Sequence, residues 1–325
     1  MTQPLPVGVV GVGALGRHHA RHLAAMHGVR LVGVFDIDVA RAADTAAEFG
    51  CRAFTSCSEL LKSVEAVTVA VTTPSHHEVG LECLSRGVAV LMEKPLAVTL
   101  SEADDLLATA ARSNLLLAVG HVERFNRAVR AAGSVLDRPV FIEGVRLAPY
   151  QPRGTDVAVV LDLMIHDLDL AIHVVGGAPA MEVRANGVSI VSPHLDIVNA
   201  RVEFAGGAVA SMTASRVARE RMRRLRIFQP SGYISLDLAT GDATFMRLRD
   251  GWRKGNGTSL EDVVETVNLS APEADALGLE LAAFVAAAQG DPAEIVSAAE
   301  GRAALALALE VTSAVERTPV PALGP

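Results

Sequence analysis

Cysteine is scarce in this chain, with three residues (Cys51, Cys57 and Cys83) among 325. Their number is odd and no two of them form a C-x-x-C pair, which argues against a disulfide framework or a zinc site. We therefore expect reduced thiols in a cytosolic protein. Internal repeats and low-complexity segments are also lacking, and the length is sufficient for two ordinary globular domains.

Long uncharged stretches are lacking as well, because no run reaches the roughly 18 residues that a membrane-spanning helix needs. The apolar start has no basic residue before Arg17 and ends in a glycine loop instead of a cleavage site, so it does not predict a signal peptide. The net charge of -8 argues against nucleic acid or an anionic membrane as the main partner. These absences favour a soluble cytoplasmic globule.

Residues 7–121 alternate short β-branched runs with amphipathic stretches. The runs predict buried strands at 7–12, 30–35, 66–71, 88–92 and 115–120. The stretches between them predict helices at 17–27, 39–49, 78–86 and 101–112. Such alternation is typical of a parallel, doubly wound sheet, so residues 1–122 are predicted to form an α/β Rossmann dinucleotide-binding domain.

The pattern changes after about residue 122. We expect a helix over 124–136, a strand over 140–147 and a long apolar helix over 157–175. Alternating residues with glycine-rich turns predict a meandering antiparallel sheet over 181–248, and two helices, at 273–288 and 293–315, follow. Residues 123–325 are therefore predicted to form an α+β domain with a large open, mainly antiparallel sheet.

A glycine-rich loop lies between the first predicted strand and the first predicted helix. Its glycines permit a tight turn and close approach of the backbone to a pyrophosphate, whose charge the helix N-terminus favours. Asp36 ends the second strand, where an acid binds the adenosine ribose and repels a 2′-phosphate, although a helix-capping aspartate would also fit there. The pattern predicts NAD as the cofactor, contacted by Gly11, Gly13, Ala14, Leu15, Gly16 and Asp36.

Two other strand ends carry polar side chains. Thr72 and Thr73, followed by His76, could line the nicotinamide ribose, and the alternative is an ordinary surface turn. Glu93-Lys94-Pro95 closes the run at 88–92, and an open α/β sheet binds its ligand at the carboxyl ends of its strands. Glu93 and Lys94 are therefore expected beside the cofactor, where Lys94 can face both the nicotinamide ring and the carbinol being oxidised.

Asp162 and His166 lie four residues apart in the long predicted helix. On an α-helix this spacing puts both side chains on one face, about 5–6 Å apart at Cβ, so the carboxylate could orient the imidazole. Oxidation of a carbinol needs a base for the hydroxyl proton, and either His166 or Lys94 could supply it. A structural network remains an alternative. A metal site is less favoured because only one histidine has ligand spacing.

Six arginines form a dense cationic run between positions 216 and 226. Alternate residues of a strand point to opposite faces, so these arginines cannot all meet one ligand. A charged strand surface that discourages edge pairing is the simpler interpretation. Recognition of a diphosphate and a salt-bridged subunit interface are the alternatives.

Together these motifs resemble those of the glucose–fructose oxidoreductase/inositol dehydrogenase/rhizopine-catabolism (Gfo/Idh/MocA) family. The resemblance covers nearly the whole chain and implies that Lys94, Asp162 and His166 are the catalytic trio. It also implies a homodimer or homotetramer formed through the C-terminal sheet. Met164 departs from the glycine that many members have there. The motifs are the glycine loop, Glu93-Lys94-Pro95, Gly120-His121, Arg124-Phe125-Asn126 and Asp162-x-x-x-His166-x-x-Asp169.

A narrower resemblance concerns the substrate. The segments 146–150 and 226–230 are similar to those of bacterial members that oxidise C3 of UDP-N-acetylglucosamine, whose keto product an aminotransferase converts to a 3-amino sugar for lipid A. A diphosphate needs cations, and arginine suits it. The expected substrate contacts are Arg124, Asn126, Arg146, Arg153 and Asp169. A dehydrogenase of a free polyol such as inositol, and a non-catalytic NAD-binding regulator, are the alternatives.

Overall fold

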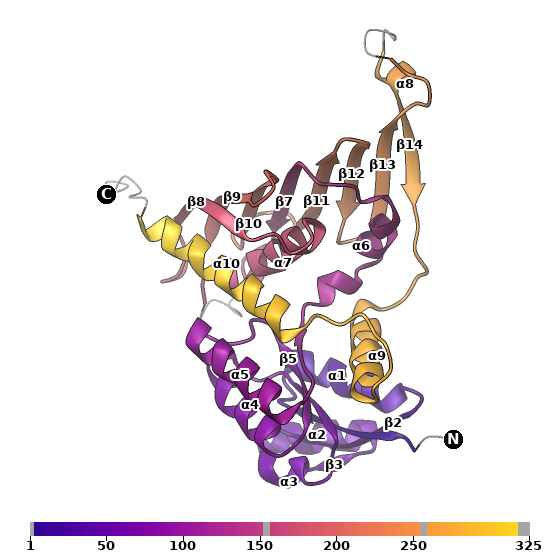
Figure 1. Cartoon of the computed structure of the whole chain (residues 1–325). Coiled ribbons are helices and arrows are strands. Elements are labelled where there is room, and N and C mark those ends of the chain that lie inside the picture. Colours follow the sequence, from indigo (N-terminus) through magenta and orange to yellow (C-terminus); the bar gives the residue numbers. More distant parts are fainter. Residues whose placement is uncertain (1–2, 152–156, 254–258, 318–325) are drawn as a thin grey trace. The chain divides into compact units, whose positions relative to one another are not determined.

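The computed structural model describes residues 3–151, 157–253 and 259–317 (Figure 1). The chain divides into two compact units, Met1–Val122 with Ala274–Leu305, and Glu123–Glu273 with Ala306–Pro325. The first unit therefore contains a segment that follows the second unit in the sequence. This differs from the expected division, which assigned everything after residue 122 to one C-terminal domain.

The first unit is built on a six-stranded parallel sheet in the order β3-β2-β1-β4-β5-β6. Its central strand β1 is buried on both faces, as apolar residues of a parallel sheet usually are. The strand order reverses beside β1, which is where doubly wound folds bind nucleotides. The predicted Rossmann fold is confirmed. Its strands are β1 Leu5–Val10, β2 Val29–Phe35, β3 Arg52–Ala53, β4 Ala66–Val69, β5 Ala89–Glu93 and β6 Leu117–Gly120. Its connecting helices are α1 Ala14–Ala25, α2 Val39–Phe49, α3 Cys57–Leu61, α4 His76–Ser85 and α5 Leu100–Ser113.

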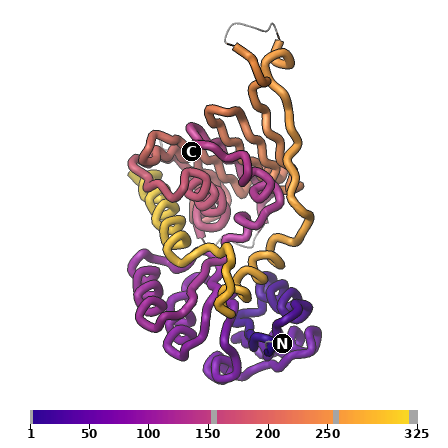
Figure 2. The backbone as a smooth tube through the Cα atoms, turned by 45° about the vertical axis from the view of Figure 1, so that its right-hand side comes forward, coloured from indigo at the N-terminus to yellow at the C-terminus, as the bar shows by residue number. Residues whose placement is uncertain are grey.

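Helix α9 Ala276–Ala288 belongs to the first unit because its apolar side chains complete that unit's core. Leu281 and Phe284 are fully buried in one cluster with Leu23 of α1 and Val7 of β1. Figure 2 shows α1 and α9, from opposite ends of the colour scale, side by side. Helix α10 Ala298–Arg317 then carries the chain from the first unit into the second.

The second unit is built on an eight-stranded sheet in the order β14-β13-β12-β11-β7-β10-β9-β8. Neighbouring strands are antiparallel except β7 and β10, which confirms the predicted open, mainly antiparallel sheet. Helices α6 Arg127–Ala132 and α7 Ile165–Val174 pack on one face, α7 against β7 and β10 and α6 against β12 and β13 (Figure 1). The strands are β7 Phe141–Leu147, β8 Ala180–Val188, β9 Ile197–Phe204, β10 Val209–Ser215, β11 Met222–Gln229, β12 Gly232–Asp237, β13 Asp242–Leu248 and β14 Val264–Leu269, and a short helix, α8 Leu260–Val263, precedes β14.

Two predicted helices of this unit are interrupted. The one expected over 124–136 consists of the 3₁₀ turns η2 Val122–Phe125 and η3 Gly133–Val135 on either side of α6. The break occurs at Asn126, whose side-chain oxygen accepts the Ala128 N–H and so begins a new helix. The long apolar helix expected over 157–175 starts instead with a π-helical turn, η4 Val160–Met164, directly before α7.

Candidate active site

The loop after β1 has the geometry that a dinucleotide pyrophosphate needs. Gly11 has a φ of +83°, and a Cβ on Gly16 would lie 1.8 Å from the Gly11 carbonyl oxygen, so α1 can start this close to β1 only with glycines. A Cβ on Gly13, the N-cap residue of α1, would meet no described atom within 4 Å. This space at the positive end of α1 suits a phosphate.

Asp36 follows β2 and binds the glycine loop directly. Its carboxylate accepts the Val12 N–H at 2.8 Å and the Asp38 N–H at 2.9 Å. The guanidinium of Arg41 lies 3.4 Å from both carboxylate oxygens of Asp36. The acid is therefore fixed at the carboxyl edge of the sheet, with a cation next to it.

Thr72, Thr73 and His76 follow β4 but differ in environment. Thr72 is exposed before the 3₁₀ turn η1 Thr73–Ser75, whereas His76 is 1% exposed. His76 Nδ1 lies 2.8 Å from the Pro95 carbonyl oxygen and Nε2 lies 3.2 Å from that of Val71, and burial lowers its pKa. The imidazole holds the segment after β5 against the segment after β4, which does not agree with the expected ribose contact.

Glu93 and Lys94 occupy the end of β5, and the peptide bond between Lys94 and Pro95 is cis. The buried Glu93 carboxylate lies 3.1 Å from Nε2 of His19 in α1 and accepts the Lys94 N–H at 3.3 Å. A Cβ on Gly120 of the neighbouring strand would lie 2.8 Å from this carboxylate, so that glycine makes room for it. Glu93, expected beside the cofactor, is thus engaged within the sheet and supports the strand end where Lys94 begins.

In the second unit, Asp162 lies in the π turn η4 and His166 in the first turn of α7. Both side chains are half-buried, whereas Met164 and Ile165 between them are fully buried. A π turn holds more residues than an α turn, so the α-helical spacing used to predict their distance does not apply here. π turns are frequent at functional sites.

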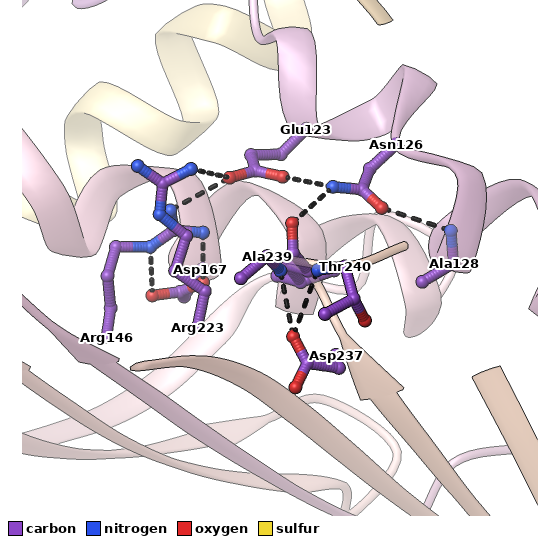
Figure 3. Close-up of polar contacts among 10 residues, drawn as sticks. Glu123, Asn126, Ala128, Arg146, Asp167, Arg223, Asp237, Ala239 and Thr240 are labelled. Carbon is purple, nitrogen blue, oxygen red and sulfur yellow. Dashed lines mark hydrogen bonds and ion pairs between the residues drawn. The ribbon is translucent and has the colours of Figure 1, made fainter. Parts of the chain in front are cut away.

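Arg146 of β7 is the centre of a buried ion-pair network (Figure 3). Its Nε and Nη2 donate to Asp167 at 2.9 and 2.8 Å, and its Nη1 donates to Glu123 at 2.8 Å. Burial opposes the charge of Arg146, but the two carboxylates outweigh it and raise its pKa. The expected contact between Arg146 and a diphosphate does not agree with this geometry, because the guanidinium is buried and committed to carboxylates.

Three other expected substrate contacts also bind side chains of their own unit. Arg124 donates to both carboxylate oxygens of Asp169, at 2.6 and 2.8 Å. Asn126 donates to Glu123 at 2.9 Å and to the Leu238 carbonyl at 2.9 Å, which completes the network in Figure 3. These residues therefore build the frame of the unit. Arg153, the fifth expected contact, lies outside the described residues.

A pocket of about 280 Å³ in the second unit brings together segments that are distant in the sequence. Asp162 of the π turn lines it together with Arg221 and Arg223, from the start of β11. Two larger pockets, of about 560 and 670 Å³, lie in the first unit. Glu65 lines both of them, at the amino ends of the strands and thus at the opposite edge of the sheet from the glycine loop. The other lining residues of the 280 Å³ pocket are Arg146, Leu147, Ala148, Pro149, Gln151, Leu163 and Arg216.

The arginine run divides among different environments. Arg224 and Arg226 face the side of the sheet opposite α6 and α7, near Asp237 at 3.7 Å and Glu143 at 2.8 Å. Arg221 and Arg223 instead line the 280 Å³ pocket, and the sequence predicted them only as members of the run. Their i, i+2 spacing, which puts both on the same side of a strand, is the signal that could have separated them from the run.

Two further findings concern the described residues only. Nowhere in 3–151, 157–253 and 259–317 do three histidine, cysteine, aspartate or glutamate side chains gather as metal ligands would. No helix within these ranges is long and apolar enough to cross a membrane.

Both units match known families. Residues 5–121 match the oxidoreductase family with an NAD-binding Rossmann fold, and residues 144–235 match the Gfo/Idh/MocA C-terminal domain. UDP-N-acetylglucosamine 3-dehydrogenase from Acidithiobacillus ferrooxidans is 40% identical over 317 residues, 95% of this chain and 96% of that protein. A solved structure of that enzyme has a TM-score of 0.89 at 38% identity and covers 98% of this chain and 99% of that one.

A second relative is similar over a shorter range. An inositol 2-dehydrogenase from Rubrobacter xylanophilus is 36% identical over 180 residues, 52% of this chain and 52% of that protein. The glycine loop with space at Gly13 and the acid fixed at the end of β2 fit the dinucleotide that the first family binds. The chain therefore belongs to the Gfo/Idh/MocA family and is an NAD-dependent oxidoreductase.

Proposed function

We propose that the protein oxidises the C3 hydroxyl of UDP-N-acetylglucosamine to a ketone. The observation that carries this proposal is the likeness, along nearly the whole chain, to a dehydrogenase with that activity. The inositol dehydrogenase considered above is similar over only about half of the chain. The cationic pocket of the second unit supports an anionic substrate over an uncharged polyol.

The chemistry divides among a small number of residues. NAD, when bound, would accept the hydride from C3. The glycines at 11, 13 and 16, with Ala14 and Leu15, would hold its pyrophosphate at the start of α1, and Asp36 would hold the adenosine ribose. Thr72 and Thr73 would lie near the nicotinamide ribose. The free space at Gly13 supports the first of these roles, and the fixed carboxylate of Asp36 at the end of β2 supports the second.

The proton of the C3 hydroxyl needs a base. We assign this step to His166, with Asp162 stabilising the imidazolium and Lys94 donating a hydrogen bond to the same oxygen. Support comes from the position of Lys94 at the carboxyl end of β5 and from the half-buried position of His166 beside the fully buried Met164 and Ile165. The 3-keto sugar nucleotide would then be the product that leaves the site.

Turnover is tested by following NADH absorbance with UDP-N-acetylglucosamine, coupled to an aminotransferase that removes the ketone. Lys94→Met and His166→Asn are each expected to lower kcat at least about 100-fold, while NADH binding stays unchanged. The exposed Lys62→Met and His27→Asn serve as matched controls with normal rates. Near-normal activity of both site variants contradicts the assignment, and turnover of inositol without the sugar nucleotide contradicts the substrate.

We further propose that the protein is a homo-oligomer assembled through the open face of the eight-stranded sheet. That face carries Phe141, Phe228 and Tyr233 in contact, with ring centroids 5.6 and 4.8 Å apart, and Phe228 is 38% exposed. An exposed aromatic cluster of this kind favours association. Light scattering should report a dimer or tetramer, and Phe228→Glu should shift it toward the monomer.

The compartment and the pathway are also part of the proposal. Cys51, Cys57 and Cys83 are free, which suits the reducing cytoplasm. A 3-keto sugar nucleotide is a substrate for transamination, so we expect the product to pass to an aminotransferase that makes a 3-amino sugar for lipid A. Growth on defined precursors with the gene deleted, followed by mass spectrometry of lipid A, would detect loss of the amino sugar.

A further inference from the structure

The connection between β10 and β11 is firmly anchored to the rest of the second unit. The Arg216 N–H donates to the Asp196 carbonyl at 2.9 Å, and its guanidinium donates to the Val157 carbonyl at 2.5 Å. The Ala218 N–H donates to the Ala148 carbonyl at 3.2 Å. This connection leads directly to Arg221, so the backbone that positions Arg221 and Arg223 at the pocket is held in place.

The cations around the pocket have unequal access to carboxylates. Arg146 takes both oxygens of Asp167 and one oxygen of Glu123. Arg223 comes only within 3.8 Å of that same Glu123 oxygen, so it shares a carboxylate that Arg146 already uses (Figure 3). Arg221 is exposed, and no ion pair holds it among the residues that the structure describes. Positive charge is therefore in excess around Arg221 and Arg223.

The environment of Arg223 agrees with this excess. The side chain is partly buried, and burial together with the neighbouring charges of Arg146 and Arg221 lowers its pKa. Burial and the neighbouring cations thus disfavour the charged form of Arg223. A bound anion would favour that form, because an opposite charge in a partly desolvated site stabilises the guanidinium. Two arginines two residues apart can present their planar donor groups to neighbouring phosphate oxygens.

The pocket lining also contains an acid. The acid is Asp162, and a carboxylate repels phosphate but accepts hydrogen bonds from sugar hydroxyls. Its volume of about 280 Å³ is below the roughly 300–1,000 Å³ of sites that enclose a whole drug-sized ligand, so it suits part of a sugar nucleotide. The lining thus combines cations suited to phosphate with an acceptor suited to sugar hydroxyls.

We propose that Arg221 and Arg223 form the subsite that binds the diphosphate of the sugar nucleotide. This inference deepens the proposed function and depends on it for the identity of the sugar, but the binding of a diphosphate can be measured separately. Arg221 and Arg223 thus take the role in diphosphate binding that was expected of Arg146 from the sequence.

Calorimetric titration of the NADH-bound full-length protein with UDP and with inorganic pyrophosphate tests the subsite. Arg221→Ala and Arg223→Ala are each expected to weaken UDP binding about 10- to 100-fold, the effect of losing one charged hydrogen bond. KM for UDP-N-acetylglucosamine should rise by a similar factor, with kcat and NADH affinity within about twofold. Added salt should weaken UDP binding more in the native protein than in the variants.

The control is Arg247→Ala, which removes an exposed cation of β13 that is paired with Glu265 of β14 and does not line the pocket. It should bind UDP normally. Arg221 is exposed, so its substitution should leave the fold intact, and thermal stabilisation by NADH checks the fold of each variant. Unchanged UDP affinity in both variants overturns the subsite.

The two proposals fail in different ways. Normal turnover of UDP-N-acetylglucosamine with arginine-independent UDP binding overturns the subsite and supports the reaction. Arginine-dependent pyrophosphate binding without turnover of the sugar nucleotide supports the subsite and overturns the sugar assignment. Tighter arginine-dependent binding of glucose 6-phosphate than of UDP assigns the site to a phosphate monoester and overturns the diphosphate.

Discussion

At the scale of single residues, the buried Arg146 network makes a large contribution to stability. Arg146→Ala leaves Asp167 and Glu123 buried without their main cation, and breaking a buried pair in this way costs about 3–5 kcal/mol. Urea unfolding monitored by circular dichroism measures the loss. Arg247→Ala, which breaks the exposed pair with Glu265, should cost less than about 1 kcal/mol. Equal losses would contradict a special role for the buried network.

The pair of Asp36 and Arg41 leads to a second residue-scale prediction. Asp36→Ser removes the acid that a 2′-phosphate would meet and leaves the nearby Arg41 guanidinium able to bind that phosphate. We expect KM for NAD to rise at least about 10-fold and the ratio of kcat/KM for NADP over NAD to increase. Asp44→Ser, an exposed acid on α2, is the matched control. An unchanged ratio would show that Asp36 does not select the cofactor.

The positions of some site residues could be predicted from the sequence, whereas the partners of others could not. The glycine loop and Asp36 lie where their motif predicts, because short-range backbone requirements determine them. Arg146 was expected to bind substrate because arginine suits a diphosphate, and Arg124 because it belongs to a motif shared with the family. The sequence does not reveal that Asp167 and Asp169, on α7, meet them across the fold. A lone cation near a site can be told from a paired one only when the tertiary contacts are known.

At the scale of elements, Asp196 stabilises the loop between β8 and β9 by accepting hydrogen bonds from it. Burial raises the pKa of its carboxyl, but hydrogen bonds from the Ser192 hydroxyl and the N–H groups of Val191, Ile190 and Ser192 outweigh burial and lower the pKa to about 2. The backbone around it is continuous with the pocket, because the Leu195 carbonyl accepts the Val159 N–H at 2.9 Å, just before the π turn.

This lowered pKa predicts how stability depends on acid. A carboxyl whose pKa is lower in the folded than in the unfolded chain stabilises the fold above about pH 4, and the stabilisation is lost as pH falls from about 4 to about 2. Asp196→Asn should therefore cost about 2 kcal/mol at pH 7 and progressively less toward pH 2. Urea unfolding across this range measures the difference, and a cost independent of pH would contradict the role of the charge.

The π turn before α7 marks the limit of pattern reasoning for elements. The apolar run at 157–175 predicted a continuous helix, and α7 is present, but hydrophobic spacing does not show where a turn takes an extra residue. The turn is bordered by tertiary hydrogen bonds from Val159 to Leu195 and from Arg216 to Val157. Contacts of this kind come from strands and loops that the local sequence does not contain.

At the scale of the whole molecule, the fold class followed from the sequence, whereas the path of the chain did not. Alternating strands and helices determine a Rossmann sheet, and strands in succession determine an antiparallel one. An apolar helix near the end of the chain shows only that it must be buried, not where. Helix α9 packs on α1 of the first unit although it follows the whole second-unit sheet.

A substitution of the fully buried Phe284 tests whether α9 stabilises the first unit. Phe284→Ala opens a cavity beside Leu23 and Val7, which should cost about 3–5 kcal/mol and act first on the NAD-binding unit. Hydrogen exchange should quicken in β1 and α1 more than in β9 and β10, and NADH should restore part of the lost stability. Leu260→Ala, an exposed leucine on α8, should change neither. Faster exchange confined to β9 and β10 would contradict the assignment of α9 to the first unit, because Phe284 would then be stabilising the other sheet.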